Sequence, residues 1–465
     1  MDLQRILIWR KGEISIKIYN TLTRRKEEFV PIEKNKVRIY VCGPTVYNRI
    51  HFGNARPIVV FDAFRRFLTA KGYEVTFVTN FTDVDDKIIT RANEEGISTE
   101  EVSKRSIEAV LEDADGLGCL RADIYPKVTE EMDGIIAMID EILKNGYAYK
   151  IEGTVYFDTE AKEDYGKLSG RDIDDQEAGA RVEVDGRKKR AGDFVLWKPA
   201  KAGEPFWKSP WGLGRPGWHI ECSWMIRKYL GITADIHAGG TDLVFPHHEN
   251  EIAQSEAANG AALAKYWMHN GMVNTDLEKM SKSDGNFFMV NDLARAYGYK
   301  PLRLYLLSFH YRSPINFAPE HVESAKSSWA RILNCVAALK DAEHQASSQA
   351  EIYKQRFYEA LEDDFNTADA IGALFELVKY ANVHPDKRAL EVLLEMCEVL
   401  GLDLEREQNQ WGMAEADIEE ILARRKLARE NRDWTLSDQL RDQLLAAGIV
   451  IKDGPEGTKW HYEAK

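Results

Sequence analysis

The sequence has few cysteines and no long apolar run. Its five cysteines, in 465 residues, are widely spaced and form no Cys-x-x-Cys pair, so we expect no disulfide framework and a reducing, cytoplasmic setting. No stretch of 18 or more apolar residues exists, which predicts no transmembrane helix and no membrane partner. The first twelve residues carry a short apolar patch without a small-residue cleavage site. We therefore do not interpret them as a signal peptide.

The chain also lacks an excess of basic residues. With 62 basic and 76 acidic residues its net charge is −14 at pH 7, so a polyanionic partner must be met by local basic patches. The hydrophobic fraction of 44% and the charged fraction of 30% are typical of a globular protein. The length has room for roughly three domains, and no internal repeat is evident.

A strand, a helix and a second strand are predicted near the amino end. Residues 36–42 (KVRIYVC) have the pattern of a buried strand, a helical apolar pattern follows over residues 53–68 up to a Lys-Gly stop, and residues 73–80 again have β character. This βαβ pattern predicts an α/β fold with a parallel sheet. Ligands of such sheets lie beyond the carboxyl ends of the strands, which is where Cys42 and His51 stand.

Two short strings carry the strongest chemical signal. His51-Phe52-Gly53-Asn54 lies at the amino end of the predicted helix. Lys279-Met280-Ser281-Lys282-Ser283 lies in a polar loop past the middle of the chain. An imidazole, an amide and two ammonium groups suit a triphosphate whose charge must be held during attack on phosphorus. Either string alone is an ordinary loop sequence. Both together, in this order, predict a nucleotide-using site.

The thiols and imidazoles allow a metal site. His247 and Glu251 stand four residues apart on a predicted helix, hence on one face, while Cys222 precedes them and Cys42 ends the first strand. Thiolates with an imidazole favour zinc. Three further histidines compete as ligands: His219, His237 and His248. Buried cysteines with a helix-capping histidine pair would give the same pattern, so the residues alone leave the question open.

The sequence resembles the cysteinyl-tRNA synthetases, a family of class I aminoacyl-tRNA synthetases. The two strings above are similar to the class signatures, and four stretches are similar to cysteine-specific ones: YVCGPTVY (40–47), NFTDVDDK (80–87), GRPGWHIECS (214–223) and GGTDLVFPHHENEIAQSE (239–256). The likeness runs from about residue 16 to the carboxyl end. Two departures are Phe52, which replaces a small aliphatic residue and should alter packing only, and Asp284, which adds a negative charge beside Lys282.

The resemblance implies a Rossmann-type parallel-sheet catalytic domain with a connective insertion, followed by an α-helical bundle and a small C-terminal anticodon-binding unit. The implied divisions are an N-terminal extension (1–15), the two catalytic halves (16–123 and 217–275), the connective insertion (124–216), a stem-contact segment with the second signature (276–325), the helical bundle (326–404) and the anticodon-binding unit (411–465).

The implied activity is ATP-dependent activation of L-cysteine to cysteinyl-adenylate, followed by transfer to the 3′ end of tRNA(Cys) with release of AMP and pyrophosphate. The implied partners are L-cysteine, ATP with Mg²⁺ and tRNA(Cys), and we expect a monomer. The resemblance selects one zinc ion per chain, held by Cys42, Cys222, His247 and Glu251. It implies an amino acid pocket lined by Thr45, Thr82, Trp218 and Asp242. It implies charge stabilisation by His51, Asn54, Lys279 and Lys282, with Gly53 beside them at the ATP.

Zinc would explain how cysteine is chosen. A pocket that reads shape alone gains only about 1–3 kcal/mol between such similar amino acids, whereas a site built for one particular group reaches roughly 10⁴ to 10⁵. A thiol loses its proton on zinc, while the hydroxyl of serine stays protonated. We therefore predict no editing domain. Two alternatives are a related ligase that joins cysteine to an amino sugar in mycothiol synthesis, and a non-catalytic RNA-binding paralogue.

The C-terminal region carries the predicted contact with tRNA. Residues 424–441 hold six basic and three acidic residues on a predicted helix pair, a modest local excess that a solvated helix face would also show. Trp434 and Trp460 either stack on unpaired anticodon bases or pack the small unit.

Overall fold

A four-stranded parallel sheet forms the centre of the catalytic part. The structure, a computed structural model, describes residues 15–171, 188–274, 289–343, 348–402, 404, 415–431, 433–446, 449–454 and 457–462. In the order β11-β10-β3-β4, every neighbouring pair of strands is parallel. The strands are β3 (Lys36–Val41), β4 (Glu74–Thr79), β10 (Ala234–Gly240) and β11 (Ala264–Asn270). The predicted parallel α/β fold is confirmed.

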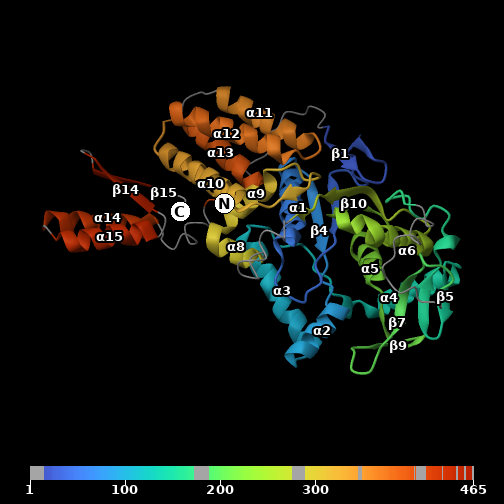
Figure 1. Cartoon of the computed structure of the whole chain (residues 1–465). Helices are drawn as coiled ribbons and strands as arrows, with labels where there is room; N and C mark the ends of the chain where they lie inside the picture. Colours follow the sequence, from blue (N-terminus) through green and yellow to red (C-terminus); the bar gives the residue numbers. More distant parts are fainter. Residues whose placement is uncertain are drawn as a thin grey trace.

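Helices cover both faces of this sheet. Successive side chains along each strand point to opposite faces, and apolar side chains on both faces pack against helices. Val37 and Ile39 of β3 belong to the apolar core that contains the helix α1 (Phe52–Ala70). Tyr40, on the opposite face, belongs to a second core. That core contains side chains from α4 (Met132–Lys144), α5 (Trp218–Leu230) and α6 (Glu249–Asn259). Figure 1 shows α1 beside β4, α5 and α6 next to β10, and α4 below these two helices. The sheet is therefore a doubly covered layer with its strand ends open for a site.

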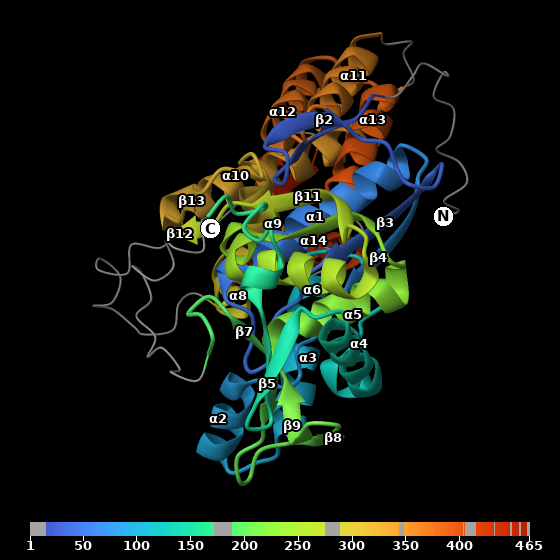
Figure 2. The same cartoon turned by 90° about the vertical axis from the view of Figure 1, so that its right-hand side faces the viewer.

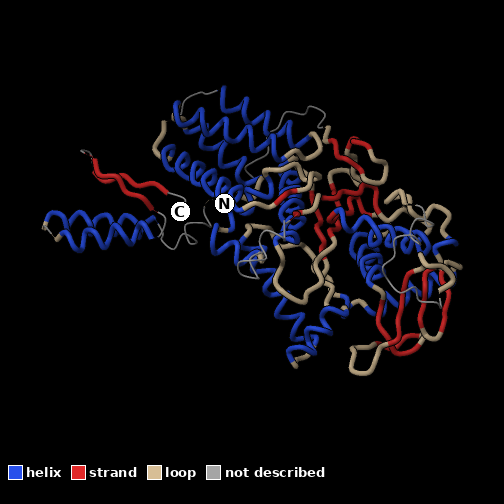
Figure 3. The backbone as a smooth tube through the Cα atoms, in the orientation of Figure 1, coloured by secondary structure: helices blue, strands red, loops and turns tan. Residues whose placement is uncertain are grey.

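A second sheet is inserted in the sequence between β4 and α5. It is antiparallel, with the order β5-β6-β7-β9-β8, and Figure 3 shows it set apart from the central sheet. Its strands are β5 (Ala148–Ile151), β6 (Thr154–Phe157), β7 (Phe194–Pro199), β8 (Trp207–Ser209) and β9 (Gly212–Pro216). Two helices precede α4 and this sheet in the chain, α2 (Asp86–Glu95) and α3 (Thr99–Gly116).

Helices follow β11 almost to the carboxyl end (Figures 1 and 2). They are α8 (Val290–Tyr297), α9 (Tyr299–Leu307), α10 (Pro319–Leu339), α11 (Ser348–Glu362), α12 (Thr367–Val383) and α13 (Lys387–Val399). A short parallel pair, β12 (Val273–Asn274) with β13 (Ile315–Asn316), brackets α8 and α9 in the sequence. An amino-terminal hairpin, β1 (Lys17–Asn20) with β2 (Arg25–Glu28), packs on β11 and the bundle.

The C-terminal unit has its own small core. It consists of the helix pair α14 (Glu415–Glu430) and α15 (Trp434–Ala446), followed by the hairpin β14 (Ile449–Gly454) and β15 (Gly457–Tyr462). Figure 1 shows it projecting to the side away from the central sheet. Across the described ranges, no helix combines the length and apolar character needed to cross a membrane.

Candidate active site and metal centre

The candidate site lies at the carboxyl ends of β3 and β10. Cys42 directly follows β3, and its backbone N–H donates to the carbonyl of Ala238 in β10 at 3.1 Å. At Gly43 an added Cβ would lie 1.7 Å from the carbonyl oxygen of Asn80, so only glycine allows the chain to pass so close to the end of β4. The Asn80 side chain in turn accepts a hydrogen bond from the Gly43 N–H at 2.9 Å. These contacts hold Cys42 in a defined position.

The four predicted metal ligands meet at this point. Cys42, Cys222 of α5, His247 and Glu251 of α6 offer ligand atoms that all lie within 4.8 Å of one another. The two sulfurs are 3.9 Å apart, and Cys42 Sγ lies 3.4 Å from Glu251 Oε1. Two sulfurs bound to tetrahedral zinc at about 2.3 Å stand about 3.8 Å apart. Both cysteines are free thiols, so the donor set fits a zinc ion.

Shifted pKa values accompany this cluster, which is buried except for the partly exposed Cys42. Burial raises the pKa of the Cys42 thiol well above its usual value, whereas a hydrogen bond with Cys42 lowers the pKa of Cys222 to about 6. Burial opposes the charged form of His247, but Glu251 and Cys222 outweigh it and raise the pKa of His247 to about 10. Burial likewise opposes ionisation of Glu251, yet His237 and His247 hold its pKa well below the usual range. The thiolate of Cys222 and the carboxylate of Glu251 are forms that bind metal ions, whereas Cys42 and His247 would each release a proton on binding one.

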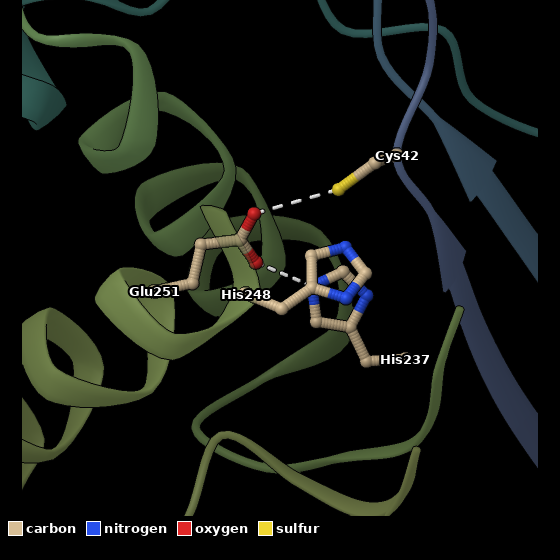
Figure 4. Close-up of side chains that lie close together, drawn as sticks. All are labelled: Cys42, His237, His248 and Glu251. Atoms are coloured by element: carbon tan, nitrogen blue, oxygen red, sulfur yellow. Dashed lines mark hydrogen bonds and ion pairs between the residues drawn. The ribbon is translucent and has the colours of Figure 1, made fainter. Parts of the chain in front are cut away.

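A second grouping shares two of these ligands. Cys42, His237, His248 and Glu251 also bring their ligand atoms within 4.8 Å of one another, and Figure 4 shows one carboxylate oxygen of Glu251 directed toward Cys42 and the other toward the imidazoles. Glu251 uses Oε2 toward His237 Nε2 and Oε1 toward His247 Nε2, the latter at 2.6 Å. The three histidines that compete as ligands in the sequence thus have different positions. His237 and His248 belong to this second grouping. His219 lies outside it and contacts His247, with 2.8 Å between their Nδ1 atoms.

A further histidine, His269, is absent from the sequence-based prediction. Its Nε2 lies 2.8 Å from His248 Nδ1, and its Nδ1 lies 2.8 Å from the hydroxyl of Thr21. The parallel register places His269 beside Gly239 of β10. No spacing pattern in the sequence points to His269, because it is 21 residues from His248 in the chain and only the strand register brings the two together.

Three of the four residues expected in the amino acid pocket lie beside the cluster. Thr45 forms a parallel bridge with Thr82, and the Thr82 hydroxyl donates to the carboxylate of Glu221 at 3.2 Å. Trp218 begins α5, is 42% exposed and stacks on His247 with 4.3 Å between ring centroids. The fourth, Asp242, is exposed in the turn after β10. In the part of the chain that the structure describes, no hydrogen bond or ion pair joins it to the other three.

The first signature string begins α1. His51 is the N-cap residue, and its Nδ1 accepts a hydrogen bond from the Gly53 N–H at 3.1 Å. Burial lowers the pKa of His51, which favours the neutral imidazole at pH 7. Asn54 is exposed in the first turn, where backbone N–H groups attract anions. Lys279 and Lys282, with the rest of the second signature and Asp284, lie outside the described residues.

Phe52 affects packing, as expected from the sequence. Its side chain is fully buried, and its ring centroid lies 5.5 Å from that of Phe317 and 6.1 Å from that of Tyr305. It therefore contributes to the core beneath the site, and the imidazole of His51 keeps its capping position.

The two tryptophans of the C-terminal unit have different environments. Trp434 is 59% exposed at the start of α15. Trp460 packs against the core of the unit, and its indole N–H donates to Glu419 at 3.0 Å. Arg425, one of the six basic residues counted in this region, is buried, so the exposed basic excess is smaller than the sequence indicates.

Three known families match successive parts of the chain. Residues 28–327 match the class described as tRNA synthetases class I (C) catalytic domain, residues 356–405 match the DALR domain, and residues 414–460 match the cysteinyl-tRNA ligase anticodon binding domain. The order of the three matches agrees with the order of sheet, helical bundle and C-terminal unit.

Relatives and solved structures give the same assignment. The cysteine–tRNA ligases of Anoxybacillus flavithermus and Clostridioides difficile are each 50% identical to this chain, across 96% of it and 99% of their own length. Methionyl-tRNA synthetase of Mycobacterium tuberculosis, solved with methionyl-adenylate, shares the fold with a TM-score of 0.56 at 16% identity, covering 78% of this chain and 89% of its own. The LeuRS of Agrobacterium radiobacter gives 0.55 at 11% identity, with coverage of 80% and 84%. The chain therefore belongs to the cysteinyl-tRNA synthetase family of class I aminoacyl-tRNA synthetases.

Proposed function

We propose that this chain activates L-cysteine with ATP and transfers it to tRNA(Cys), and that one zinc ion held in the buried cluster selects the amino acid. ATP-dependent charging of tRNA with cysteine is the activity of the family. The zinc ligands proposed are Cys42, Cys222, His247 and Glu251. The observation that carries the selection is the convergence of two thiols, an imidazole and a carboxylate at the carboxyl end of the sheet.

The two thiols favour this grouping over the one with His237 and His248. Zinc binds thiolates in preference to harder ligands, and only the proposed set contains both Cys42 and Cys222. The remaining histidines then orient the ligands, because His237 hydrogen-bonds Glu251 and His219 contacts the second nitrogen of His247. Such outer contacts set the tautomer and direction of metal ligands.

The side chains around the cluster would bind and orient the amino acid. When bound, the zinc ion supplies a soft ligand position at which a thiol loses its proton and a serine hydroxyl does not. Trp218 covers His247 on one side and limits the size of the amino acid. Thr82 and Thr45 form the wall nearest Glu221. Asp242 offers a carboxylate to the substrate ammonium group.

The amino end of α1 would hold ATP, which binds as its Mg²⁺ complex. The amino acid carboxylate attacks the α-phosphorus in line, and pyrophosphate leaves as the P–O bond to it breaks. Neutral His51 and Asn54 bind the phosphate oxygens beside Gly53, whose N–H donates to His51 Nδ1, while Lys279 and Lys282 neutralise the charge that develops. In the second step a terminal ribose hydroxyl of tRNA attacks the cysteinyl carbonyl, and AMP leaves.

Cysteine-dependent ATP–pyrophosphate exchange tests this function. Metal-free and zinc-restored protein are compared, with serine as competitor. We expect exchange with cysteine, loss of exchange after metal removal and recovery with zinc, and no comparable exchange with serine. Exchange that persists without metal would contradict the zinc assignment, and absence of any cysteine-dependent exchange would contradict the activity.

The alternative function, a ligase that joins cysteine to an amino sugar, differs from the proposed one in the acceptor of the cysteinyl group. AMP release is measured with tRNA and, in parallel, with an amino sugar as acceptor. The match of residues 414–460 to an anticodon binding domain favours tRNA, so we expect AMP release only with tRNA.

Replacing the exposed Trp434 by alanine should weaken tRNA binding. Stacking of a base on an aromatic ring is worth about 1–3 kcal/mol, so we expect KM for tRNA in aminoacylation to rise roughly 10-fold, by the same principle. Pyrophosphate exchange should be unchanged, because Trp434 is remote from the sheet. Leu427→Ala, at an exposed position on α14, is the matched control, and an equal effect there would argue against stacking.

We also propose that the protein is a monomer in the cytoplasm. All five cysteines are free thiols in the structure, which suits a reducing compartment. Sedimentation velocity at micromolar concentration tests the oligomeric state, and a dimer-sized species would contradict it.

A further inference from the structure

Arg56, in the second turn of α1, is a buried cation without an acidic partner among the described residues. Its side chain is fully buried, and burial lowers the pKa of the guanidinium to about 10. Its hydrogen bonds go to three backbone carbonyls. Nη1 donates to Gly271 at 2.6 Å and to Met272 at 3.1 Å, and Nη2 donates to His310 at 3.2 Å. Burying a charge against carbonyls alone is unfavourable, so packing alone does not account for Arg56.

The carbonyls that Arg56 binds belong to two different chain segments. Gly271 and Met272 connect β11 to β12, whereas His310 precedes β13. At Gly271 an added Cβ would lie 2.5 Å from the carbonyl oxygen of Ser313, so glycine is required for the two segments to approach. The guanidinium therefore fastens both segments to α1 at one point.

The first of these segments leads into the second signature. Lys279 and Lys282 follow Asn274 by five and eight residues in the sequence. On the far side of the signature, Met289 forms an antiparallel bridge with His51, and the N–H of Val290 donates to the carbonyl of Ile50 at 3.1 Å. The described residues before and after the signature are thus both attached to the start of α1.

We propose that Arg56 is a positioning residue for adenylate formation: it holds residues 271–272, from which the second signature continues, at a set distance from His51. Arg56 lies five residues after His51, about 7.5 Å along the helix. The same helix would then position the imidazole directly and residues 271–272, which precede the second signature in the sequence, through the guanidinium fork. This inference rests on the proposed function and deepens it.

Three substitutions test the role of the fork. Arg56→Lys keeps the charge but cannot reach three carbonyls as a planar fork does. Arg56→Ala removes the side chain and leaves the carbonyls as acceptors for added guanidinium ion. Arg66→Ala is the matched control, because Arg66 lies on the same helix and also donates to backbone carbonyls, those of Gly118 and Glu398, far from residues 271–272.

The activity measurement is cysteine-dependent pyrophosphate exchange, with kcat and KM determined separately. For both Arg56 variants we expect kcat to fall roughly 10- to 100-fold, as misplacement of reacting groups by about 1 Å does, with KM for cysteine and zinc content unchanged. Guanidinium at millimolar concentration should restore Arg56→Ala in a saturable way, and ammonium should not. Arg66→Ala should keep the wild-type kcat.

A second measurement does not depend on activity. The N–H of Ile315 donates to Met272 and that of Phe317 to Asn274, at 2.8 and 2.9 Å. Amide hydrogen exchange at these two positions should accelerate in both Arg56 variants and not in Arg66→Ala. If the wild type lacked exchange activity while the amides still responded, the proposed function would fail and the anchoring would stand. Wild-type kcat in both Arg56 variants, an equal loss in Arg66→Ala, or no recovery with guanidinium would overturn the proposal.

Discussion

Replacing Cys222 by serine should reduce the discrimination between cysteine and serine to what the shape of the pocket provides. The wild type is expected to prefer cysteine by roughly 10⁴ to 10⁵, because its site is built to bind the substrate thiol. Without Cys222 the thiol is no longer recognised by the metal site, and only the roughly 10- to 200-fold preference that pocket shape provides should remain. Cys222 is buried, its sulfur lies 3.9 Å from that of Cys42, and its lowered pKa favours the thiolate. The measurement is kcat/KM for cysteine and for serine in pyrophosphate exchange, together with zinc content per chain.

Two controls show which side chains hold the metal. Cys335→Ser changes a buried cysteine in α10 that contacts the carbonyl of Val378, and it should leave zinc content and selectivity intact. His248→Asn separates the two ligand groupings. If Cys42, His237, His248 and Glu251 held the metal, Cys222→Ser would keep zinc and His248→Asn would lose it. That pattern would refute the proposed ligand set.

Replacing Arg303 by methionine should destabilise the catalytic part by about 3–5 kcal/mol, the usual result of breaking a buried ion pair by removing one partner. Arg303 is fully buried in α9. Its Nη2 donates to Asp62 at 2.6 Å, its Nε to the carbonyl of Leu400 at 2.6 Å, and its Nη1 to that of Leu117 at 3.1 Å. One guanidinium therefore joins α1, α3 and the end of α13. The free energy of unfolding, measured in urea, is the test.

The pH dependence gives this prediction a second check. Burial raises the pKa of Asp62, but Arg303 and Arg66 outweigh it and the net pKa is lowered. The stabilisation is therefore present above the pKa of an unfolded aspartate, about 3.9, and is lost as pH falls through the lower folded value. The difference between wild type and Arg303→Met should shrink in acid. Arg66→Met removes the more exposed partner of Asp62 and should lose less; an equal loss would show that burial of Arg303 is not the cause.

Much of the fold can be predicted from local patterns. The three elements of the βαβ unit are predicted to within two residues at each end, as the observed β3, α1 and β4 show. Apolar periodicity, the cap at His51 and the Lys71-Gly72 stop are all properties of neighbouring residues. The five-stranded inserted sheet is foreseen only as the connective insertion over residues 124–216, because its strands are short and one gap between them, from Phe157 to Phe194, is long.

The site is less predictable from sequence. The spacing of His247 and Glu251 indicates one helical face, and the two do contact each other. The sequence alone leaves His237 and His248 as competitors, and the structure explains why: alternation along β10 turns Ile236 toward the core with α1 and His237 toward Glu251. The sequence around Arg56 does not indicate which backbone carbonyls its guanidinium binds, because these carbonyls are 215 to 254 residues away in the chain.

By itself the sequence determined the family, the order of its parts, the two signature strings and the local helices and strands, since each depends on residues close together in the chain. Only the tertiary structure decided that Cys42 meets Cys222 across 180 residues, that His269 supports His248, and that Arg56 ties α1 to Gly271. Those contacts follow from the pairing of parallel strands and the packing of helices on them. Parallel neighbours are joined by long crossover connections, so the residues that meet are far apart in the chain and no local pattern specifies them.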